Sequence, residues 1–213
     1  MGDPARLEGM ARYGIQTADA VGVTVTELRR LARRLGRDHG LAAGLWASGV
    51  HEARILASLV DDPALVTEAQ MDAWVADLDS WDVCDGVCGN LFDRTPFALD
   101  KAAEWTAREA EFEKRAGFAL IAWAAVHRND LPDRAFAELL PTIRERSTDE
   151  RTYVKKAVSW ALRSIGKRSR GLNTKAIRTA EQIARIDARA ARWVARDVLR
   201  ELRGDPVQAR LNR

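Results

Sequence analysis

Residues 154–167 read VKKAVSWALRSIGK, and at about 100° per residue this helical segment sorts onto two opposite faces. One face carries residues suited to a core, which are Val154, Ala157, Val158, Ala161, Leu162 and Ile165. The opposite face is a stripe about 60° wide, which holds Lys156, Trp160, Arg163 and Lys167. The segment therefore predicts an amphipathic helix that can bury one side without its tryptophan.

Trp160 lies among three cations on this stripe, and two interpretations fit that position. Cations neutralise phosphates and an indole ring stacks on a base or a sugar, so the stripe suits a surface that binds nucleic acid. In the other interpretation, the ring only lies flat under the aliphatic stems of the Lys and Arg side chains. The helix by itself leaves both open.

The composition of the whole chain extends the helical prediction. The 213 residues are 46% hydrophobic, enough for a core of one domain. Alanine, leucine, arginine and glutamate are common, whereas runs of β-branched residues are rare. We predict an all-α protein with a single domain over residues 1–213.

Helical periodicity and turn residues divide the chain into short helices. Three capping boxes are predicted, at Thr24/Glu27, Thr67/Gln70 and Ser147/Glu150. The predicted helices are 4–16, 26–36, 38–47, 50–60, 67–77, 80–92, 97–105, 106–127, 133–145, 149–168, 173–185 and 188–203. Taken in pairs they give a unit of roughly 35 to 45 residues, the size of a HEAT or armadillo repeat. The prediction is an α-solenoid of HEAT-like repeats.

Several classes of protein are disfavoured. No stretch approaches the roughly 18 to 20 apolar residues of a membrane span, and the N-terminus does not resemble a secretory signal. Cys84 and Cys88 lie one helical turn apart, and His39, His51 and His127 show no ligand spacing. We therefore expect a cytoplasmic protein with reduced, packed cysteines, no metal and no cofactor.

The net charge of +3 conceals a strong asymmetry. Residues 151–213 hold 17 Lys or Arg against five acidic residues, a formal charge of +12, so residues 1–150 carry −9. Such polarity favours a polyanionic partner, and nucleic acid fits better than a membrane because the C-terminal helices lack a broad aromatic and leucine-rich face.

The second informative segment is Ser80-Trp81-Asp82-Val83-Cys84-Asp85. Ser80 or Asp79 can cap a helix whose packing side is Val83, Val87 and Leu91. Trp81 and Asp85 share another side with Cys88 and Phe92. A carboxylate beside an indole and apolar groups needs compensation, so Asp85 is either a functional acid or an acid paired with an arginine at a groove.

A candidate cation lies in the predicted helix 106–127. Arg115 shares its face with Ala119, Ala122 and Val126, a stripe suited to close packing. An arginine there needs an anion, which a protein carboxylate or a phosphate can supply, or lies at the end of the packed region. Lys114 falls on a more polar face, where we expect it to be solvated.

Four segments together resemble the bacterial DNA alkylation repair family, the AlkD-like HEAT-repeat DNA glycosylases. They are Met10-Ala11-Arg12-Tyr13, Ser80 to Asp85, Lys114-Arg115-Ala116 and Val154 to Trp160, and the resemblance covers about residues 10–168. It implies an α-solenoid with a concave basic groove for duplex DNA. Active members release N3- and N7-alkylated purines without flipping the base into a pocket.

The resemblance also implies roles for individual residues. It makes Asp85 the catalytic carboxylate, with Trp81 and Trp160 as aromatic walls around the lesion's sugar and Arg115 on the DNA backbone. Tyr13 becomes a further contact near the lesion, and Asp82, on another helical face, is structural. The remaining DNA contacts expected on the basic helix are Lys155, Lys156, Arg163 and Lys167.

These residue types suit the chemistry. A purine alkylated at N3 or N7 is cationic and leaves readily, so the enzyme mainly has to stabilise an oxocarbenium-like deoxyribose, which a carboxylate does electrostatically. We therefore predict a monomeric glycosylase acting on duplex DNA that contains alkylated purines. The alternatives are a non-catalytic HEAT-like binder of distorted or branched DNA and a protein-interaction scaffold.

Overall fold

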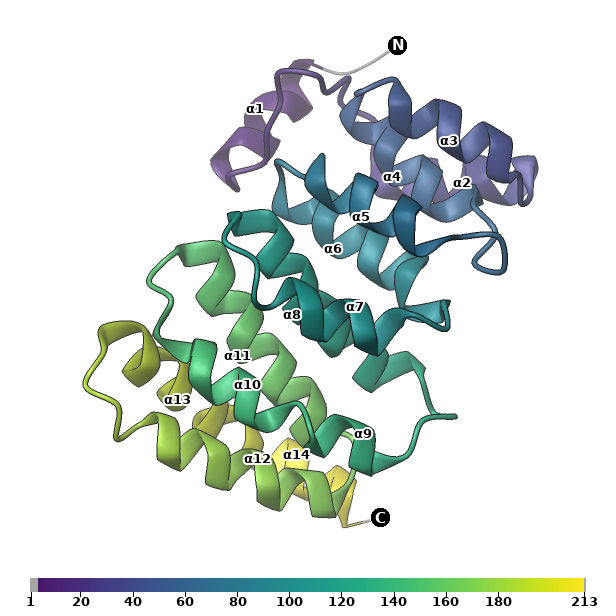
Figure 1. Cartoon of the computed structure of the whole chain (residues 1–213). Helices are drawn as coiled ribbons and strands as arrows, with labels where there is room; N and C mark the ends of the chain where they lie inside the picture. Colours follow the sequence, from purple (N-terminus) through teal and green to yellow (C-terminus); the bar gives the residue numbers. More distant parts are fainter. Residues whose placement is uncertain (1–3, 213) are drawn as a thin grey trace. The chain divides into compact units, whose positions relative to one another are not determined.

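The computed structural model describes residues 4–212, whose secondary structure consists of helices joined by turns, with no strand in that range (Figure 1). The α-helices are α1 Pro4–Arg12, α2 Val25–Leu35, α3 His39–Ala47, α4 His51–Val60, α5 Glu68–Ala76, α6 Trp81–Asn90, α7 Ala98–Trp105, α8 Glu111–His127, α9 Asp133–Ala137, α10 Leu140–Glu145, α11 Thr152–Gly166, α12 Arg170–Ile183, α13 Arg189–Leu202 and α14 Asp205–Leu211. Short 3₁₀ helices follow α6 (Phe92–Arg94) and α10 (Arg146–Thr148). The prediction of an all-α chain is confirmed.

The predicted capping boxes have three different outcomes. Thr24 and Glu27 form the complete reciprocal box at the start of α2. Thr67 caps α5 by accepting from the Gln70 amide, but the Gln70 side chain donates to Asp61 instead. The third prediction is wrong, because Ser147 lies in a 3₁₀ helix and donates to the carbonyl of Arg144.

Element boundaries differ where prolines and glycines act. The predicted helix 133–145 is two helices, and α10 starts at Leu140 with Pro141 in its first turn, where a missing N–H costs nothing. α1 ends at Arg12 rather than at residue 16, because Gly14 has a φ of 71° and leads the chain out of the helix. α14 was not predicted, and α8 begins at Glu111 rather than at residue 106.

The chain divides into two compact units, Met1–Phe97 and Ala98–Arg213. In the first unit α4 packs against α2, α3 and α6. The indole rings of Trp46 in α3 and Trp74 in α5 stack with centroids 4.1 Å apart, and both are buried. Aromatic stacking of this kind adds to the stabilisation from burial, so it holds α5 against the α3–α4 pair.

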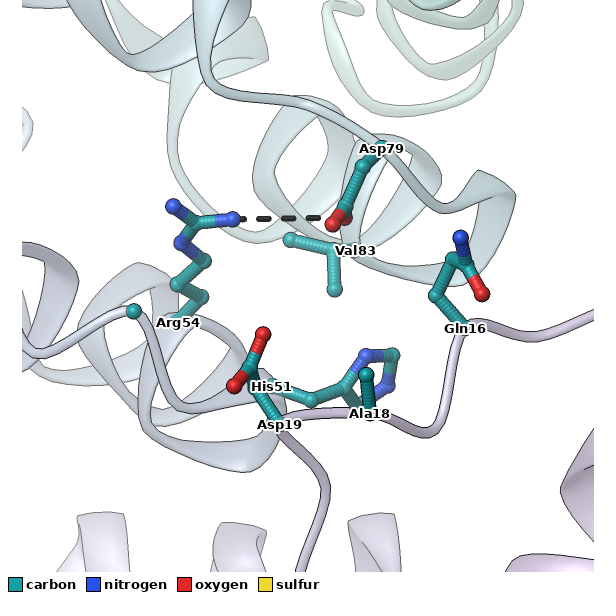
Figure 2. A pocket seen from close by; sticks show the side chains of 8 residues that line it. Gln16, Ala18, Asp19, His51, Arg54, Asp79 and Val83 are labelled. Atoms are coloured by element: carbon teal, nitrogen blue, oxygen red, sulfur yellow. Dashed lines mark ion pairs between the residues drawn. The ribbon is translucent and has the colours of Figure 1, made fainter.

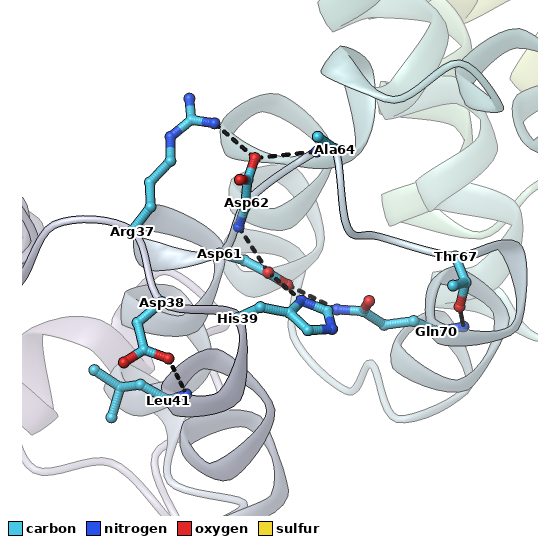
Figure 3. Close-up of polar contacts among 9 residues, drawn as sticks. All are labelled: Arg37, Asp38, His39, Leu41, Asp61, Asp62, Ala64, Thr67 and Gln70. Carbon is cyan, nitrogen blue, oxygen red and sulfur yellow. Dashed lines mark hydrogen bonds and ion pairs between the residues drawn. The ribbon is translucent and has the colours of Figure 1, made fainter.

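Polar side chains join the turns of the first unit (Figure 3). The buried Asp61 carboxylate lies 2.7 Å from Nδ1 of His39 and accepts a hydrogen bond from the Gln70 amide. Elsewhere, the buried Glu52 carboxylate accepts the backbone N–H groups of residues 21, 22 and 23. Hydrogen bonds of ionised groups to backbone N–H are strong, so Glu52 holds the loop between α1 and α2 on α4.

The second unit has two layers of helices. Figure 1 shows α7, α10 and α12 in front of α8, α11 and α13. Across the two layers α7 packs against α8, α10 against α11, and α12 against α13. In the rear layer α8 packs against α11, and α11 against α13. The face of α11 from Val154 to Ile165 is fully buried as predicted, because it meets helices on several sides.

None of the described helices is long and apolar enough to cross a membrane. Cys84 and Cys88 are buried in α6 and form no disulfide with each other. Burial raises the pKa of the Cys88 thiol, so it stays protonated and packs as a small apolar group. The prediction that both cysteines are packing residues is confirmed by their burial.

Candidate functional site

Helix α6 presents Trp81 and Asp85 on one partly buried face. Val83, Val87 and Leu91 are buried on the packing side, as predicted. Along the face of Trp81, the side chains become more buried toward the end of α6, since Cys88 and Phe92 are fully enclosed. The first five residues of α6 are therefore the part at which an indole and a carboxylate remain accessible.

The position of Trp81 is linked to the end of α1. Its indole N–H donates to the backbone carbonyl of Tyr13 over 3.1 Å, while the Tyr13 side chain is 77% exposed. A cavity of about 450 Å³ lies beside this contact, lined by Arg6, Gly9, Met10, Tyr13, Ile15, Gly22, Val23, Thr24, Val25, His51, Glu52, Ile55 and Asp82. Two residues predicted to lie near the lesion, Tyr13 and Trp81, are thus neighbours.

Asp82 pairs with protein groups. One carboxylate oxygen lies 2.8 Å from Nε2 of His51, and the other accepts the hydroxyl of Ser80 over 2.6 Å. Ser80 is the N-cap of α6, but its side chain caps no backbone N–H because it is engaged with Asp82. Burial alone would raise the pKa of Asp82, and the hydrogen bonds from His51 and Ser80 outweigh it and lower that pKa. These contacts give Asp82 a structural role.

A small polar pocket of about 40 Å³ lies at the start of α6 (Figure 2). In this pocket Arg54 of α4 and Asp79 form an ion pair, with a long distance of 3.9 Å between guanidinium and carboxylate. Arg54 also donates to the carbonyl of Asp77 and lies over the Trp46 ring. Since Arg54 is held by these contacts, it ties the turn before α6 to α4.

In the second unit the side chain of Arg115, which belongs to α8, packs against α11. It is 6% exposed, and its Nη1 donates to the backbone carbonyl of Tyr153 over 2.7 Å. The guanidinium also lies 6.0 Å from the centroid of the Tyr153 ring. These contacts hold Arg115 in a defined orientation, which suits a positioned cation.

The expectation that Lys114 is solvated is wrong. Lys114 is 5% exposed, and its ammonium lies 3.5 Å from the carboxylate of Asp149. The face of α8 that carries Lys114 looked polar in sequence, but the segment before α11 covers it. Asp149 also pairs with Arg151, so it shares its charge between two cations.

Trp160 is not in the core. It is partly buried, and its ring meets that of Trp123 edge to face, with centroids 5.4 Å apart and an interplanar angle of 82°. Trp123 in turn stacks on His127, with centroids 5.0 Å apart. The aromatic surface on α8 and α11 is therefore larger than the sequence reasoning recognised, and the signal for it was Trp123 one turn before His127.

The basic stripe of α11 is partly neutralised by α13. Glu201 pairs with both Arg163 and Lys167, and Asp197 lies 3.4 Å from the Arg163 guanidinium. Burial alone would raise the pKa of Glu201, and the hydrogen bonds from Lys167 and Arg163 lower it instead, so it is ionised at neutral pH. Lys156, at the other end of the stripe, is exposed and has no carboxylate partner within residues 4–212.

The predicted site residues fall into two groups. Tyr13, Trp81 and Asp85 lie in the first unit, and Arg115, Lys155, Lys156, Trp160, Arg163 and Lys167 lie in the second. Within the first group Trp81 contacts Tyr13. Within the second group the stripe, which includes Trp160, forms one face of α11. The convergence of both groups on one groove stays a prediction.

A metal site is not apparent in the described part of the chain. Residues 4–212 contain no cluster of three or more His, Cys, Asp or Glu side chains that could hold an ion. The histidines have other neighbours, since His39 and His51 contact aspartates and His127 stacks on Trp123. The side chains on α6 and α11 therefore offer carboxylate, aromatic and cationic chemistry.

Comparison with known proteins shows which fold and which family the chain shares. No curated protein matches the chain. One solved structure matches the chain with a TM-score of 0.77 and 19% identity, over 94% of this chain and 90% of that one. That structure is described as belonging to a new family of proteins related to the HEAT-like repeat DNA glycosylases, with affinity for branched DNA structures. The match confirms the HEAT-like helical-repeat fold. The family model described as DNA alkylation repair enzyme matches residues 1–202. The chain therefore belongs to the DNA alkylation repair enzyme family.

Proposed function

We propose that this protein is a DNA glycosylase that releases N3- or N7-alkylated purines from duplex DNA. The observation that carries the proposal is the pair of partly buried side chains, Trp81 and Asp85, one turn apart on α6 in a chain of this family. An indole and a carboxylate at that spacing can both face one sugar, because residues at i and i+4 lie on the same side of a helix.

In the proposed reaction Asp85 acts on the deoxyribose. As the bond between C1′ and the purine nitrogen lengthens, its electron pair moves to the cationic base, and positive charge develops on the sugar. The Asp85 carboxylate stabilises that charge and orients the water that attacks C1′. The water's proton leaves to solvent, and the products are a free base and an abasic site.

The aromatic residues and Arg115 complete the proposed site. Trp81 and Trp160 present indole faces to the charged nucleotide, which a cation–π interaction stabilises. Arg115, held by Tyr153, would bind the phosphate next to the lesion. Neither role requires the base to leave the helix, so the lesion would be processed in the stack, without base flipping.

The proposed DNA contacts differ in how readily they are made. Lys156 is exposed and has no carboxylate partner in residues 4–212, so it can bind a phosphate without breaking an ion pair there. Arg163 and Lys167 are paired with Glu201, so DNA has to compete with that carboxylate for them. Tyr13 is exposed and lies next to Trp81. We propose that a monomer uses these residues to hold duplex DNA.

The test is release of free base from duplex DNA that contains 7-methylguanine. Asp85→Asn removes the charge and is expected to abolish release while duplex affinity is retained, since the carboxylate contributes to the transition state and repels phosphate. Asp79→Asn is the matched control, because Asp79 is exposed and lies just before α6. Release that is unchanged in Asp85→Asn contradicts the assigned mechanism.

A second function is a non-catalytic binder of branched DNA. It is favoured by the solved relative, whose description names affinity for branched DNA structures. Under this alternative the wild-type protein releases no base but binds a branched duplex more tightly than a linear one, and Asp85→Asn changes neither property. The same two variants therefore separate the two functions.

A further inference from the structure

The sequence of α13 repeats the pattern of the basic stripe on α11. Lys156, Trp160, Arg163 and Lys167 on α11 follow the spacing i, i+4, i+7 and i+11. The corresponding positions on α13 are Arg189, Trp193, Arg196 and Arg200. Both helices thus carry a cation, a tryptophan and two further cations along one face.

This face of α13 points away from the core. The opposite face of the helix is buried, and it consists of Ala190, Ala191, Val194, Ala195, Val198 and Leu202. Arg189 and Arg196 are exposed, and Trp193 is partly buried. Because α13 already has a complete apolar face, its packing does not require the indole of Trp193.

Helix α11 contributes one more cation beside this tryptophan. The ammonium of Lys155 lies 5.9 Å from the centroid of the Trp193 ring. The indole is therefore bordered by Lys155 from α11 and by Arg189 and Arg196 from its own helix. We call these four residues the α13 platform.

The α13 platform differs from the α11 stripe in its charge balance. Glu201 pairs with both Arg163 and Lys167 on α11. On α13, Arg200 pairs with Asp197, but none of the three platform cations forms an ion pair with a carboxylate within the described residues 4–212. Three uncompensated cations around one indole favour a partner that is both anionic and aromatic.

We propose that the α13 platform binds an unpaired nucleotide of DNA. Trp193 stacks on the base, and Lys155, Arg189 and Arg196 bind the phosphates on either side. A fully paired duplex keeps its base faces stacked inside, so it can use only the cations, whereas a single-stranded gap or arm offers a free base face. This inference rests on the proposed function only in taking DNA as the ligand.

The test compares two labelled DNAs of the same sequence by fluorescence anisotropy, one fully paired and one with a short single-stranded gap. Trp193→Ala is expected to weaken binding of the gapped DNA by roughly 5- to 150-fold, the loss of one stacked base. Binding of the paired duplex should change little. Trp193→Phe keeps an aromatic face and should retain most of the preference for gapped DNA over paired DNA. This variant also provides the test if Trp193→Ala folds poorly.

The cations are tested through the salt dependence of binding. Arg196→Ala should lower the slope of log K against log salt by about one unit. Lys175→Ala is the matched control, because Lys175 is an exposed cation on α12 without an ion pair in residues 4–212, and its slope should equal that of the wild type. Equal slopes in all three proteins overturn the assignment of Arg196.

The outcome for the platform is distinguishable from that of the proposed function. If Trp193→Ala lowers affinity equally for both DNAs or for neither, the platform is overturned, whatever the base-release assay shows. If the wild type releases no alkylated base, the glycosylase proposal fails. A preference for gapped DNA that is lost in Trp193→Ala supports the platform even in that case.

Discussion

The indole N–H of Trp81 donates a hydrogen bond to the backbone carbonyl of Tyr13, across 3.1 Å. The bond joins the start of α6 to the turn after α1, and it orients the ring that we assign to the proposed catalytic face. Because the acceptor is a backbone atom, changing the Tyr13 side chain does not remove it. Changing Trp81 does.

Trp81→Phe therefore tests whether this bond holds α1 in place. The change removes the donor and keeps an aromatic ring, so unfolding should become easier by only about 0.5–1.5 kcal/mol. Amide hydrogen exchange in α1 should become faster. Tyr13→Phe is the control and should leave exchange in α1 unchanged, while slow exchange in Trp81→Phe would show that other contacts hold α1.

Glu201→Gln should tighten DNA binding. The change removes the carboxylate partner of Lys167 and one of the two carboxylate partners of Arg163, which keeps Asp197, so both cations become more available to phosphates. The salt dependence of duplex binding should steepen by up to about two units, roughly one for each cation. Glu181→Gln is the control, since it makes the same charge change on α12, where Glu181 pairs with Arg203. Equal salt slopes for the two variants would exclude a DNA contact by Arg163 and Lys167.

The pair of His51 and Asp82 should make stability depend on pH. Burial alone would lower the pKa of His51, but the hydrogen bond and charge of Asp82 raise it above 6.5. A raised histidine pKa stabilises the fold below 6.5 and loses this effect as pH rises through the folded value. The pKa of Asp82 is lowered below 3.8, so its contribution is present above that value and is lost as pH falls.

The stabilisation by this pair should therefore be largest at about pH 5 and smaller at about pH 9. The measurement is urea unfolding of the wild type and Asp82→Asn at both pH values. Asp130→Asn is the control, because Asp130 pairs with Arg128, which keeps its charge throughout this range. A difference between wild type and Asp82→Asn that is the same at both pH values would contradict the coupling.

Two glycines should respond oppositely to alanine. At Gly117 an added Cβ would lie 2.6 Å from the backbone nitrogen of Thr106 and 2.9 Å from the carbonyl oxygen of Ala102, so Gly117→Ala should destabilise the protein by about 1–3 kcal/mol. At Gly86 the nearest atom is the Asn90 side-chain nitrogen at 3.8 Å. Gly86→Ala should stabilise by up to about 1 kcal/mol, through helix propensity alone.

The midpoint of urea unfolding measures the change in stability of Gly117→Ala and of Gly86→Ala. Each variant differs from the wild type by one added methyl group. Because both glycines lie inside helices, helix propensity acts in the same direction at each. A stabilising Gly117→Ala would mean that α7 can move away from α8 without loss. The two results together separate intrinsic helix propensity from the close approach of these helices.

The sequence was most informative where a property depends on neighbours along one helix. The periodicity of residues 154–167 correctly placed the buried face of α11 and kept Trp160 out of the core. The pattern around Asp85 likewise identified Val83, Val87 and Leu91 as the packing side of α6. Side chains at these spacings share a face whatever the rest of the chain does, because the geometry of a helix is local.

Tertiary structure decided which charges are available and which helices approach closely. Glu201 is distant in sequence from the cations with which it pairs, and Asp149 pairs with Lys114, which looked solvated on its own helix. Gly117 is required by the backbone of α7, and Trp81 is held by a residue near the N-terminus. The amino-acid sequence by itself determined the helices and their faces, since these follow from short-range spacing. The pairing of one face with another was decided only by the folded chain, because ion pairs and close contacts depend on distances in space that helical periodicity does not encode.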